Sequence, residues 1–455
     1  MRSIRQFIIL CFALFISAGL SATTIYVDDN ALNDPGPGNP ALSDPFENGT
    51  SAHPYDAIQE GIDAAADGVD DVLVKEGTYT GDGNRDLDFG GRAITLKSEK
   101  GPENTVIYSE GTAVNPHRGF LFTSGESADS IVDGFTIRNG MTGNHGGGIY
   151  CNASSPTIKN CIVAGNEAGD FGGGIACENG SSPNITDCVI MYNSAGYYGG
   201  GIYCDYGSAP ITNCIITNNS AGFYGGGIFT LDCSSVISHC TVIENESDKG
   251  GGIHSSWRCK LTITNCLVTD NVAFDCGGGI SCTKSLVLIT NCTIAANSAV
   301  YGAALACDSY LQLDPSYVEI SDCIFWNGSL QVWNKDASKI IVAYSDVQGG
   351  WIGAGNIDKN PLFVSGPLHD YYLSQKSAGQ PTESLCVDTG SDTAANLDLD
   401  QLTTRNDSEY DTGMVDMGYH SPPPICIYSI ARSGNDIIIQ WNATCRILVR
   451  CRVVC

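Results

Sequence analysis

One short motif, three glycines followed by isoleucine, recurs through the middle of the chain at intervals of 25 to 27 residues. The triplets begin at Gly146, Gly172, Gly199, Gly225, Gly250 and Gly277, and a degenerate copy begins at Gly302. Self-similarity at a fixed period of this length is typical of repeat architectures, in which each unit buries its apolar face only against the next unit. The strict copying argues against an ordinary sandwich, and the density of glycine argues against an all-α fold.

Further landmarks occupy fixed places in each repeat, beginning with a column of cysteines at Cys161, Cys188, Cys214, Cys240, Cys266, Cys292 and Cys323. Three residues before each cysteine stands an isoleucine, at Ile158, Ile185, Ile211, Ile237, Ile263, Ile289 and Ile320. Five residues after the first six cysteines stands an asparagine, at Asn166, Asn193, Asn219, Asn245, Asn271 and Asn297. Apolar residues two apart, such as Cys161 and Val163, indicate short strands with those side chains on one face.

Strands this short cannot bury an apolar face alone, but successive repeats can stack so that each strand pairs in parallel with its copy in the next repeat. Neighbouring coils then lie about 4.8 Å apart, with isoleucine on isoleucine, cysteine on cysteine and asparagine on asparagine. Asn or Asp usually precedes the cysteine, where the chain is expected to bend. The sequence therefore predicts an all-β, parallel β-helix solenoid over residues 51–345.

The two ends of the stack are expected to be covered. Residues 55–65 have helical spacing of apolar positions and predict a capping helix. Residues 23–50 form an N-terminal segment, and residues 346–420 are expected to form an irregular C-terminal cap. Residues 421–455 start with a proline-rich linker, followed by what resembles the first strands of a fibronectin-type-III module.

The first 22 residues are typical of a secretory signal peptide, with Arg2 and Arg5 ahead of an apolar run from 7 to 20. We therefore expect a secreted, cell-surface or outer-membrane-associated protein, with no membrane span in the mature chain. The formal net charge of −27 argues against nucleic acid or an anionic membrane face as a partner, because both are bound through Lys and Arg.

The repeat resembles those of bacterial right-handed β-helix proteins with a pectin-lyase-like fold, over roughly residues 23 to 420. Its Gly-Gly-Gly-Ile motif is also similar to the Gly-Gly-Ala-Ile signature of the chlamydial polymorphic outer membrane proteins. The resemblance implies a right-handed solenoid with an N-terminal capping helix. It is specific for fold and not for function.

The cysteines allow two interpretations. A second column runs Cys151, Cys177, Cys204, Thr230, Ser255, Cys282 and Cys307, and either column could form a disulfide or metal ladder. Alternatively they are small buried thiols, since Thr230 and Ser255 replace cysteine without difficulty. We expect Cys161, Cys188, Cys214, Cys240, Cys266 and Cys292 to be buried and mostly reduced. The scattered histidines give no metal-binding pattern with them, and no metal site or catalytic residue is predicted.

Three aromatic residues, Tyr150, Tyr203 and Phe229, stand between inward positions and should point outward. Such a stripe could bind glycans or a cell-surface protein, or its rings could merely stack on their own copies. Acidic clusters around 28–44 and 398–411 would suit Ca²⁺, although solvated loop acid is the simpler interpretation; no other cofactor is expected.

Outward strand positions are mostly Tyr, Ala, Lys, Thr or Ile, and no pair of acids repeats on neighbouring coils. The sequence thus favours an exported, non-catalytic structural, adhesion or carbohydrate-contacting scaffold. The alternative is a secreted polysaccharide lyase or glycoside hydrolase, which would need acid or base groups grouped on adjacent coils.

Overall fold

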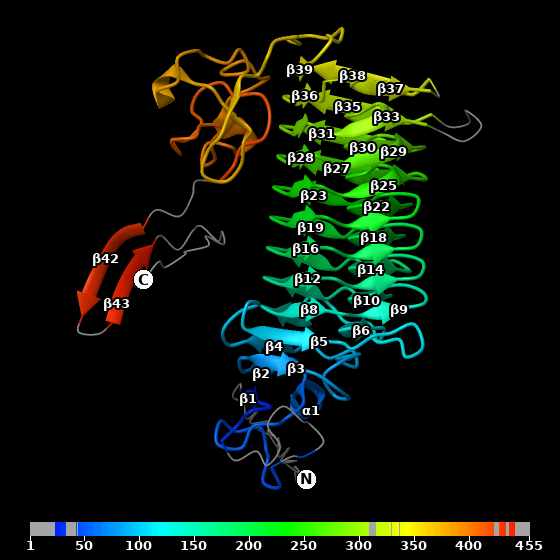
Figure 1. Cartoon of the computed structure of the whole chain (residues 1–455), viewed down its shortest axis with the longest axis vertical. Helices are drawn as coiled ribbons and strands as arrows, with labels where there is room; N and C mark the ends of the chain where they lie inside the picture. The colour runs from blue at the N-terminus through cyan, green and yellow to red at the C-terminus, as the bar shows by residue number, and fades with distance from the viewer. Residues whose placement is uncertain are drawn as a thin grey trace, which may run out of the picture.

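The chain winds into a tall stack of coils built from short parallel strands (Figure 1). This computed structural model describes residues 23–32, 42, 44–308, 315–328, 330–335 and 337–422, together with the backbone of 427–433 and 436–441. The leader expected over 1–22 lies outside the described residues. The predicted all-β class and parallel β-helix are confirmed.

Four parallel sheets run along the stack, and each complete coil gives one strand to each in turn. Sheet 1 contains β1 (Thr24–Val27), β2 (Asp71–Val74), β4 (Thr95–Ser98), β7 (Ile131–Asp133), β11 (Thr157–Lys159), β15 (Asn184–Thr186), β19 (Pro210–Thr212), β23 (Val236–Ser238), β27 (Lys260–Thr264), β31 (Leu286–Thr290), β35 (Tyr317–Ser321) and β38 (Lys339–Ala343). Sheet 2 contains β3 (Gly77–Tyr79), β5 (Thr105–Tyr108), β8 (Thr136–Arg138), β12 (Ile162–Ala164), β16 (Val189–Met191), β20 (Ile215–Thr217), β24 (Thr241–Ile243), β28 (Leu267–Thr269), β32 (Thr293–Ala295), β36 (Ile324–Trp326) and β39 (Asp346–Val347).

The other two sheets lie on either side of the glycine turns. Sheet 3 contains β9 (Met141–Thr142), β13 (Glu167–Ala168), β17 (Ser194–Ala195), β21 (Ser220–Ala221), β25 (Glu246–Lys249), β29 (Val272–Cys276) and β33 (Ser298–Tyr301). Sheet 4 contains β6 (Phe120–Phe122), β10 (Ile149–Asn152), β14 (Ile175–Glu178), β18 (Ile202–Asp205), β22 (Ile228–Leu231), β26 (Ile253–Ser256), β30 (Ile280–Thr283), β34 (Leu305–Cys307) and β37 (Val332–Asn334).

The predicted register is confirmed, because Ile158 pairs with Ile185, and the pairing continues coil by coil to Ile320. All seven isoleucines of this column are buried in the main core. Burying such a side chain contributes roughly 1.5–3 kcal/mol each, so the column is a major source of stability.

The bends between sheets 1 and 2 are made where the sequence predicted them, by residues in the left-handed region such as Asn160, Asp187 and Asn213, each with φ of 54°. In the glycine triplets the first residue has a positive φ, as at Gly172. The second has no room for a side chain: a Cβ on Gly173 would lie 2.3 Å from the carbonyl oxygen of Ser194.

The six predicted asparagines form a buried hydrogen-bonded ladder. The Oδ1 atom of Asn219 accepts from both the backbone N–H and the Nδ2 atom of Asn193 in the preceding coil, each at 3.0 Å. The Nδ2 atom of Asn219 also donates to the carbonyl of Ile190. The ladder satisfies buried backbone groups that would otherwise be costly to desolvate.

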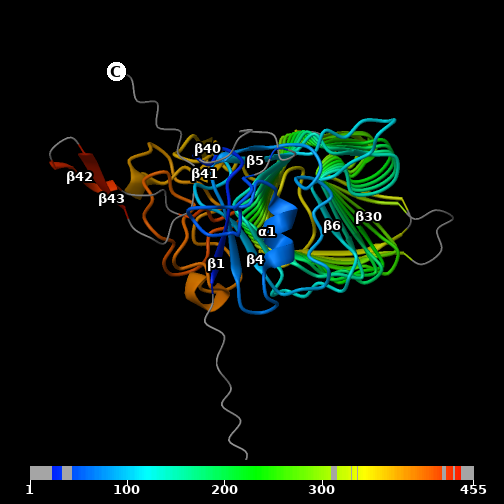
Figure 2. The same cartoon turned by 90° about the horizontal axis from the view of Figure 1, so that it is seen from below.

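At the N-terminal end, helix α1 (Ile58–Ala64) lies across the opening of the coils, as Figure 2 shows. Ile58 and Ile62 are fully buried, which agrees with the predicted capping helix. The solenoid begins before residue 51, because β1 in the N-terminal segment pairs with β2.

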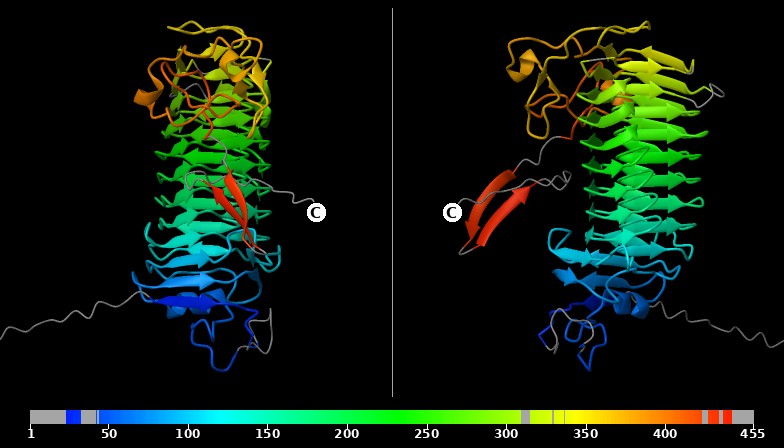
Figure 3. Two further views of the ribbon diagram at one scale, coloured as in Figure 1. Left: turned by 90° about the vertical axis from the view of Figure 1, so that its left-hand side faces the viewer. Right: turned by 45° about the vertical axis from the view of Figure 1, so that its right-hand side comes forward.

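After β39 the chain becomes irregular, as expected, and residues 358–421 pack along the outer side of sheet 2 (Figures 1 and 3). This region holds β40 (Phe363–Val364), β41 (Tyr372–Leu373), η2 (Lys376–Ala378) and η3 (Ala394–Leu397). Its small core is formed with Ile324 of β36. The side-chain amide of Asn265 pairs with the backbone N–H and carbonyl of His420, at 2.7 and 2.8 Å.

Strands β42 (Ile427–Ser433) and β43 (Asp436–Trp441) form an antiparallel hairpin within the segment predicted to begin a sandwich-like module. No helix in the described part of the chain is long and apolar enough to span a bilayer.

Candidate ligand-binding site

The aromatic stripe predicted to be an exposed contact surface is a covered stack. Tyr203 and Phe229 point away from the main core as expected, but only 3% and 2% of their surface is accessible. They are covered by the rings that precede the glycine turns: Phe171 lies 4.8 Å from Tyr203, and Tyr198 lies 4.9 Å from Phe229. The prediction of an accessible stripe is therefore wrong at these two positions, and the alternative of stacked rings is confirmed.

Tyr150, the third member of the predicted stripe, is half-buried. Its hydroxyl donates to the Glu178 carboxylate at 2.8 Å, and the Arg118 guanidinium lies 5.1 Å from its ring. Burial and the bond to Glu178 hold the pKa of Tyr150 well above its usual value. This hydroxyl is occupied within the protein, so Tyr150 contributes structure at this position.

Beside the covered stack, at the turns that precede the glycine triplets, a second set of aromatic rings is exposed. Tyr197 and Phe223 are each 44% exposed, and their rings stack with centroids 5.5 Å apart. They lie on neighbouring coils and present a flat apolar ridge beside the covered stack. A ridge of this kind supplies contact area without charge.

A second exposed aromatic site combines rings with positive charge at the corner between sheets 4 and 1. An open pocket there is lined by Trp257, Arg258, Lys284, Ser285, Leu286, Pro315 and Tyr317. The Lys284 Nζ atom lies 4.5 Å from the centroid of the Trp257 ring, which is 54% exposed. A cation over an indole face at this distance is an attractive arrangement that also orients the ammonium group.

The pocket exists because each coil turns this corner through the left-handed region. The corner residues, with φ from 47° to 55°, are Ala153, Asn179, Tyr206, Asp232, Trp257 and Lys284. Asn and Asp tolerate this conformation, whereas Trp257 and Lys284 adopt it at a cost of roughly 1–2 kcal/mol. The conformation recurs in all of these coils, so this corner is distinguished by its exposed aromatic and cationic side chains and not by its backbone.

The electrostatics of the corner differ from those of the whole chain. Arg258, Lys260 and Lys284 gather on two adjacent coils of a protein whose formal net charge is −27. Beside them, the Tyr317 hydroxyl donates to Glu319, and Lys339 lies 5.0 Å from the Tyr317 ring. The site offers aromatic faces together with cationic donors, which is the chemistry that contacts a ring carrying a carboxylate.

Sequence reasoning missed this pocket, although a signal was present. The segment Trp257-Arg258-Cys259-Lys260 brings an indole ring and two cations to a corner where the other coils carry Ala153, Asn179, Tyr206, Asp232 or Lys284 followed by small residues. Recognising it requires the corner residues of successive coils to be aligned, and the spacing at this corner varies by one residue.

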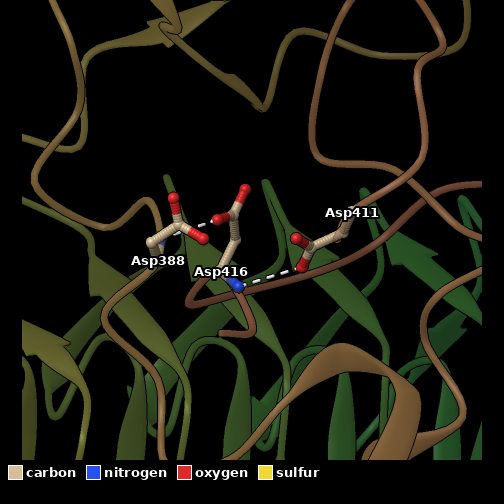
Figure 4. Close-up of side chains that lie close together, drawn as sticks. All are labelled: Asp388, Asp411 and Asp416. Carbon is tan, nitrogen blue, oxygen red and sulfur yellow. Dashed lines mark hydrogen bonds between the residues drawn. The ribbon is translucent and has the colours of Figure 1, made fainter. Parts of the chain in front are cut away.

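Three carboxylates, Asp388, Asp411 and Asp416, converge in the C-terminal region, with ligand oxygens within 4.8 Å of one another (Figure 4). Of the acidic residues predicted to suit Ca²⁺, only Asp411 belongs to this group. Both oxygens of Asp416 already accept bonds from the protein, from Gln375, Thr404 and the Asp388 N–H. Burial and the neighbouring Asp411 raise the pKa of Asp416 to about 6. The oxygens are of the type that binds Ca²⁺, and the bonds also explain the cluster as a structural brace.

The ladder cysteines Cys161, Cys188, Cys214, Cys240, Cys266 and Cys292 are all buried, as predicted. Each thiol lies 3.1 to 3.3 Å from the carbonyl oxygen two residues earlier, to which it donates. Burial raises the pKa of these thiols well above the usual value. Their reduced state stays a prediction.

Comparison with known proteins identifies the architecture. A model of the family described as the right-handed beta helix region matches residues 74–228 and 224–347. A solved structure, the crystal structure of pectate lyase Pel9A, is 15% identical, with a TM-score of 0.50, and the match covers 89% of this chain and 98% of that one. A search of curated proteins finds no match. At this identity the likeness shows the fold alone, and the similarity to chlamydial repeats stays a prediction.

Proposed function

We propose that this chain, which belongs to the right-handed β-helix family, is an exported, non-catalytic scaffold that binds carbohydrate through the corner between sheets 4 and 1. The observation that carries the proposal is the placement of Lys284 over Trp257, with Arg258 in the same open pocket. The ligand class is a glycan that bears carboxylate groups.

The physical argument rests on a match of chemistry and shape. The exposed indole ring gives apolar contact area for a sugar ring, and the Arg258 guanidinium in the same pocket can meet its carboxylate. Because the corner is built on paired strands, these side chains are held in place before the ligand arrives, which lowers the entropy cost of binding. The exposed ridge of Tyr197 and Phe223 offers further contact area on another edge of the coils.

Binding without cleavage is the favoured role. Hydrolysis of a glycosidic bond requires a pair of carboxyl groups, and the described lining of this open pocket contains Arg258, Lys284 and Tyr317 but no Asp or Glu. The alternative, a secreted polysaccharide lyase or glycoside hydrolase, makes a different prediction, namely that purified protein releases unsaturated or reducing sugars. Attachment to a cell surface, which the expected leader would permit, belongs to the same proposal.

The test is a panel of acidic and neutral polysaccharides, with and without Ca²⁺, using the whole protein and two matched variants. Trp257→Ala should weaken binding to the acidic glycan at least about tenfold, the equivalent of about 1.4 kcal/mol. Tyr206→Ala is the control, because Tyr206 occupies the same corner two coils earlier and is 62% exposed. Equal binding by wild type and Trp257→Ala would overturn the proposed site, and sugar release by wild type would overturn the non-catalytic role.

A further inference from the structure

In two neighbouring coils a buried cysteine stands at a corner instead of in the strand of sheet 4. In sheet 4 the cysteine column is interrupted by Thr230 and Ser255, and in those same two coils Cys233 and Cys259 occupy the following corner. Other coils have serine at that corner, and the same bond recurs there: Ser154 N–H donates to Ser181 Oγ, as Cys233 N–H donates to Cys259 Sγ. Each of these two coils therefore has a hydroxyl at the strand position and a thiol at the corner, where other coils have the reverse.

This arrangement produces two pairs of facing thiols, Cys233 with Cys259 and Cys282 with Cys307. The Sγ atoms of Cys233 and Cys259 are 3.6 Å apart, and those of Cys282 and Cys307 are 3.2 Å apart. In sheet 4 the second pair is bounded by Ser255 on one side and Asn334 on the other, so no third thiol continues the column there.

The long ladder that begins at Cys161 is different. Its thiols donate to backbone carbonyls, as Cys214 does to Thr212 at 3.2 Å and to Ile185 at 3.7 Å. In the ladder the short contacts of each sulfur are with backbone carbonyl oxygens, whereas each of the two pairs has a short sulfur–sulfur contact, accompanied at Cys233 by a contact with Ser235 Oγ at 3.5 Å. The buried cysteines therefore differ in their contacts, and Cys151, Cys177 and Cys204 of sheet 4 form a third group of aligned thiols.

We propose that Cys233–Cys259 and Cys282–Cys307 are sites of oxidation to disulfides that staple neighbouring coils, while the ladder cysteines stay as thiols. Cys282 and Cys307 are aligned partners on adjacent parallel strands, and the interstrand spacing of about 4.8 Å falls inside the range of Cα separations that a disulfide spans. Small movements of the side chains bring the sulfurs from contact to bonding distance.

The chemistry is thiol–disulfide exchange with an oxidised disulfide, either a small molecule such as oxidised glutathione or a protein oxidant. One cysteine thiolate attacks a sulfur of the oxidant and displaces one thiolate from it. The second cysteine thiolate then attacks the resulting mixed disulfide and displaces the other thiolate. The chain loses two hydrogen atoms per bridge, and one oxidant disulfide is reduced to two thiols.

The two bridges would join consecutive pairs of coils. The first links the coil of Thr230 to the coil that carries Trp257, and the second links the coil that carries Lys284 to the next. The inference does not rest on the proposed glycan binding, since each bridge is detected by its covalent linkage alone.

The experiment is refolding of the full chain from the reduced, unfolded state in a buffer of reduced and oxidised glutathione, so that every cysteine meets the oxidant. Free thiols are then alkylated in denaturant, and the protein is digested without reductant for mass spectrometry. We expect linked peptides for Cys233–Cys259 and Cys282–Cys307, and alkylated peptides for Cys161, Cys188, Cys214, Cys240, Cys266 and Cys292. Alkylation of the four paired cysteines, or bridges within the ladder, would overturn the proposal.

Two variants keep the result specific. Cys233→Ser should fold, because serine is the residue found at this corner in other coils, and it should expose Cys259 as an alkylated thiol while Cys282–Cys307 stays linked. Cys214→Ser should leave both bridges in place. Loss of both bridges in either variant would show that the pairs are not independent sites and would contradict the assignment.

Discussion

The side-chain Nδ2 atom of Asn219 donates to the Oδ1 atom of Asn245 one coil further on, at 3.0 Å, with both side chains completely buried. The same Oδ1 atom also accepts the backbone N–H of Asn219. One amide thus satisfies a side chain and a backbone group of its neighbour, so the removal of one asparagine leaves several buried groups without partners.

Asn219→Leu is therefore expected to be strongly destabilising. It leaves the backbone N–H of Asn193 and one of its two side-chain N–H groups unsatisfied, and each such group costs about 1–3 kcal/mol. We expect a loss of about 2–5 kcal/mol in the free energy of unfolding, measured by urea denaturation. Asn144→Ala, at an exposed position outside the left-handed region, is the control and should change stability by less than about 0.5 kcal/mol.

The covered aromatic stack gives a second prediction. Phe229→Ala should cost about 3–5 kcal/mol, because it removes a buried ring that contacts rings in both neighbouring coils. Phe223→Ala, which removes an exposed ring of the adjacent ridge, should cost far less. Thermal unfolding of the two variants compares them directly, and similar losses would contradict the difference in burial.

The buried thiols make stability depend on alkaline pH. Burial raises the pKa of Cys188, Cys214 and Cys240 in the folded state, so the unfolded chain loses these protons first as the pH rises. The folded state then binds more protons, and the free energy of unfolding falls above the unfolded thiol pKa of about 8.5, by up to about 1.4 kcal/mol per pH unit for each thiol.

This fall is measured as the urea midpoint at several pH values under reducing conditions. The thiol contribution should be constant below about pH 8 and decline above it. A variant with Cys188, Cys214 and Cys240 replaced by alanine should show a shallower decline. A wild-type midpoint that does not fall up to about pH 10 would refute the linkage.

The attachment of the C-terminal region can be tested through one residue. Asn265→Leu removes the amide that pairs with both backbone groups of His420, so residues 358–421 should open locally while the coils stay folded. Hydrogen exchange should rise in that region alone. Asn213→Leu is the matched control, because Asn213 occupies the same bend two coils earlier and is exposed. Equal exchange in both variants would show that this pairing does not hold the region.

The repeat was sufficient to predict the coils, because one-to-one stacking follows from copies of nearly equal length. Ile158 lies against Ile185 and Asn219 against Asn245 for that reason. The exposure of Tyr203 could not be read in the same way. Strand alternation tells on which side of the sheet a ring lies, but not whether Phe171, from the glycine turn, folds over it.

The candidate pocket could not be predicted for a related reason. Trp257 and Lys284 meet because two coils turn the same corner in the left-handed conformation, and that alignment appears only when the backbone is known. The position of the C-terminal region likewise depends on contacts between residues far apart in sequence. Asn265 and His420 are separated by 155 positions, and nothing in the local pattern of either residue indicates their pairing.

Every amide in the asparagine ladder donates its side-chain hydrogen bond in the same direction, toward the C-terminal end of the stack. The ladder is thus polar, with a first acceptor that serves Gly140 and a last donor bonded to Gln331. Each amide bonds only to its counterpart in the next coil, so no contact in the ladder fixes the number of coils. The length of the solenoid can therefore change by whole coils. Duplication or deletion of one repeat adds or removes a coil without creating an unsatisfied amide, provided that both ends are kept.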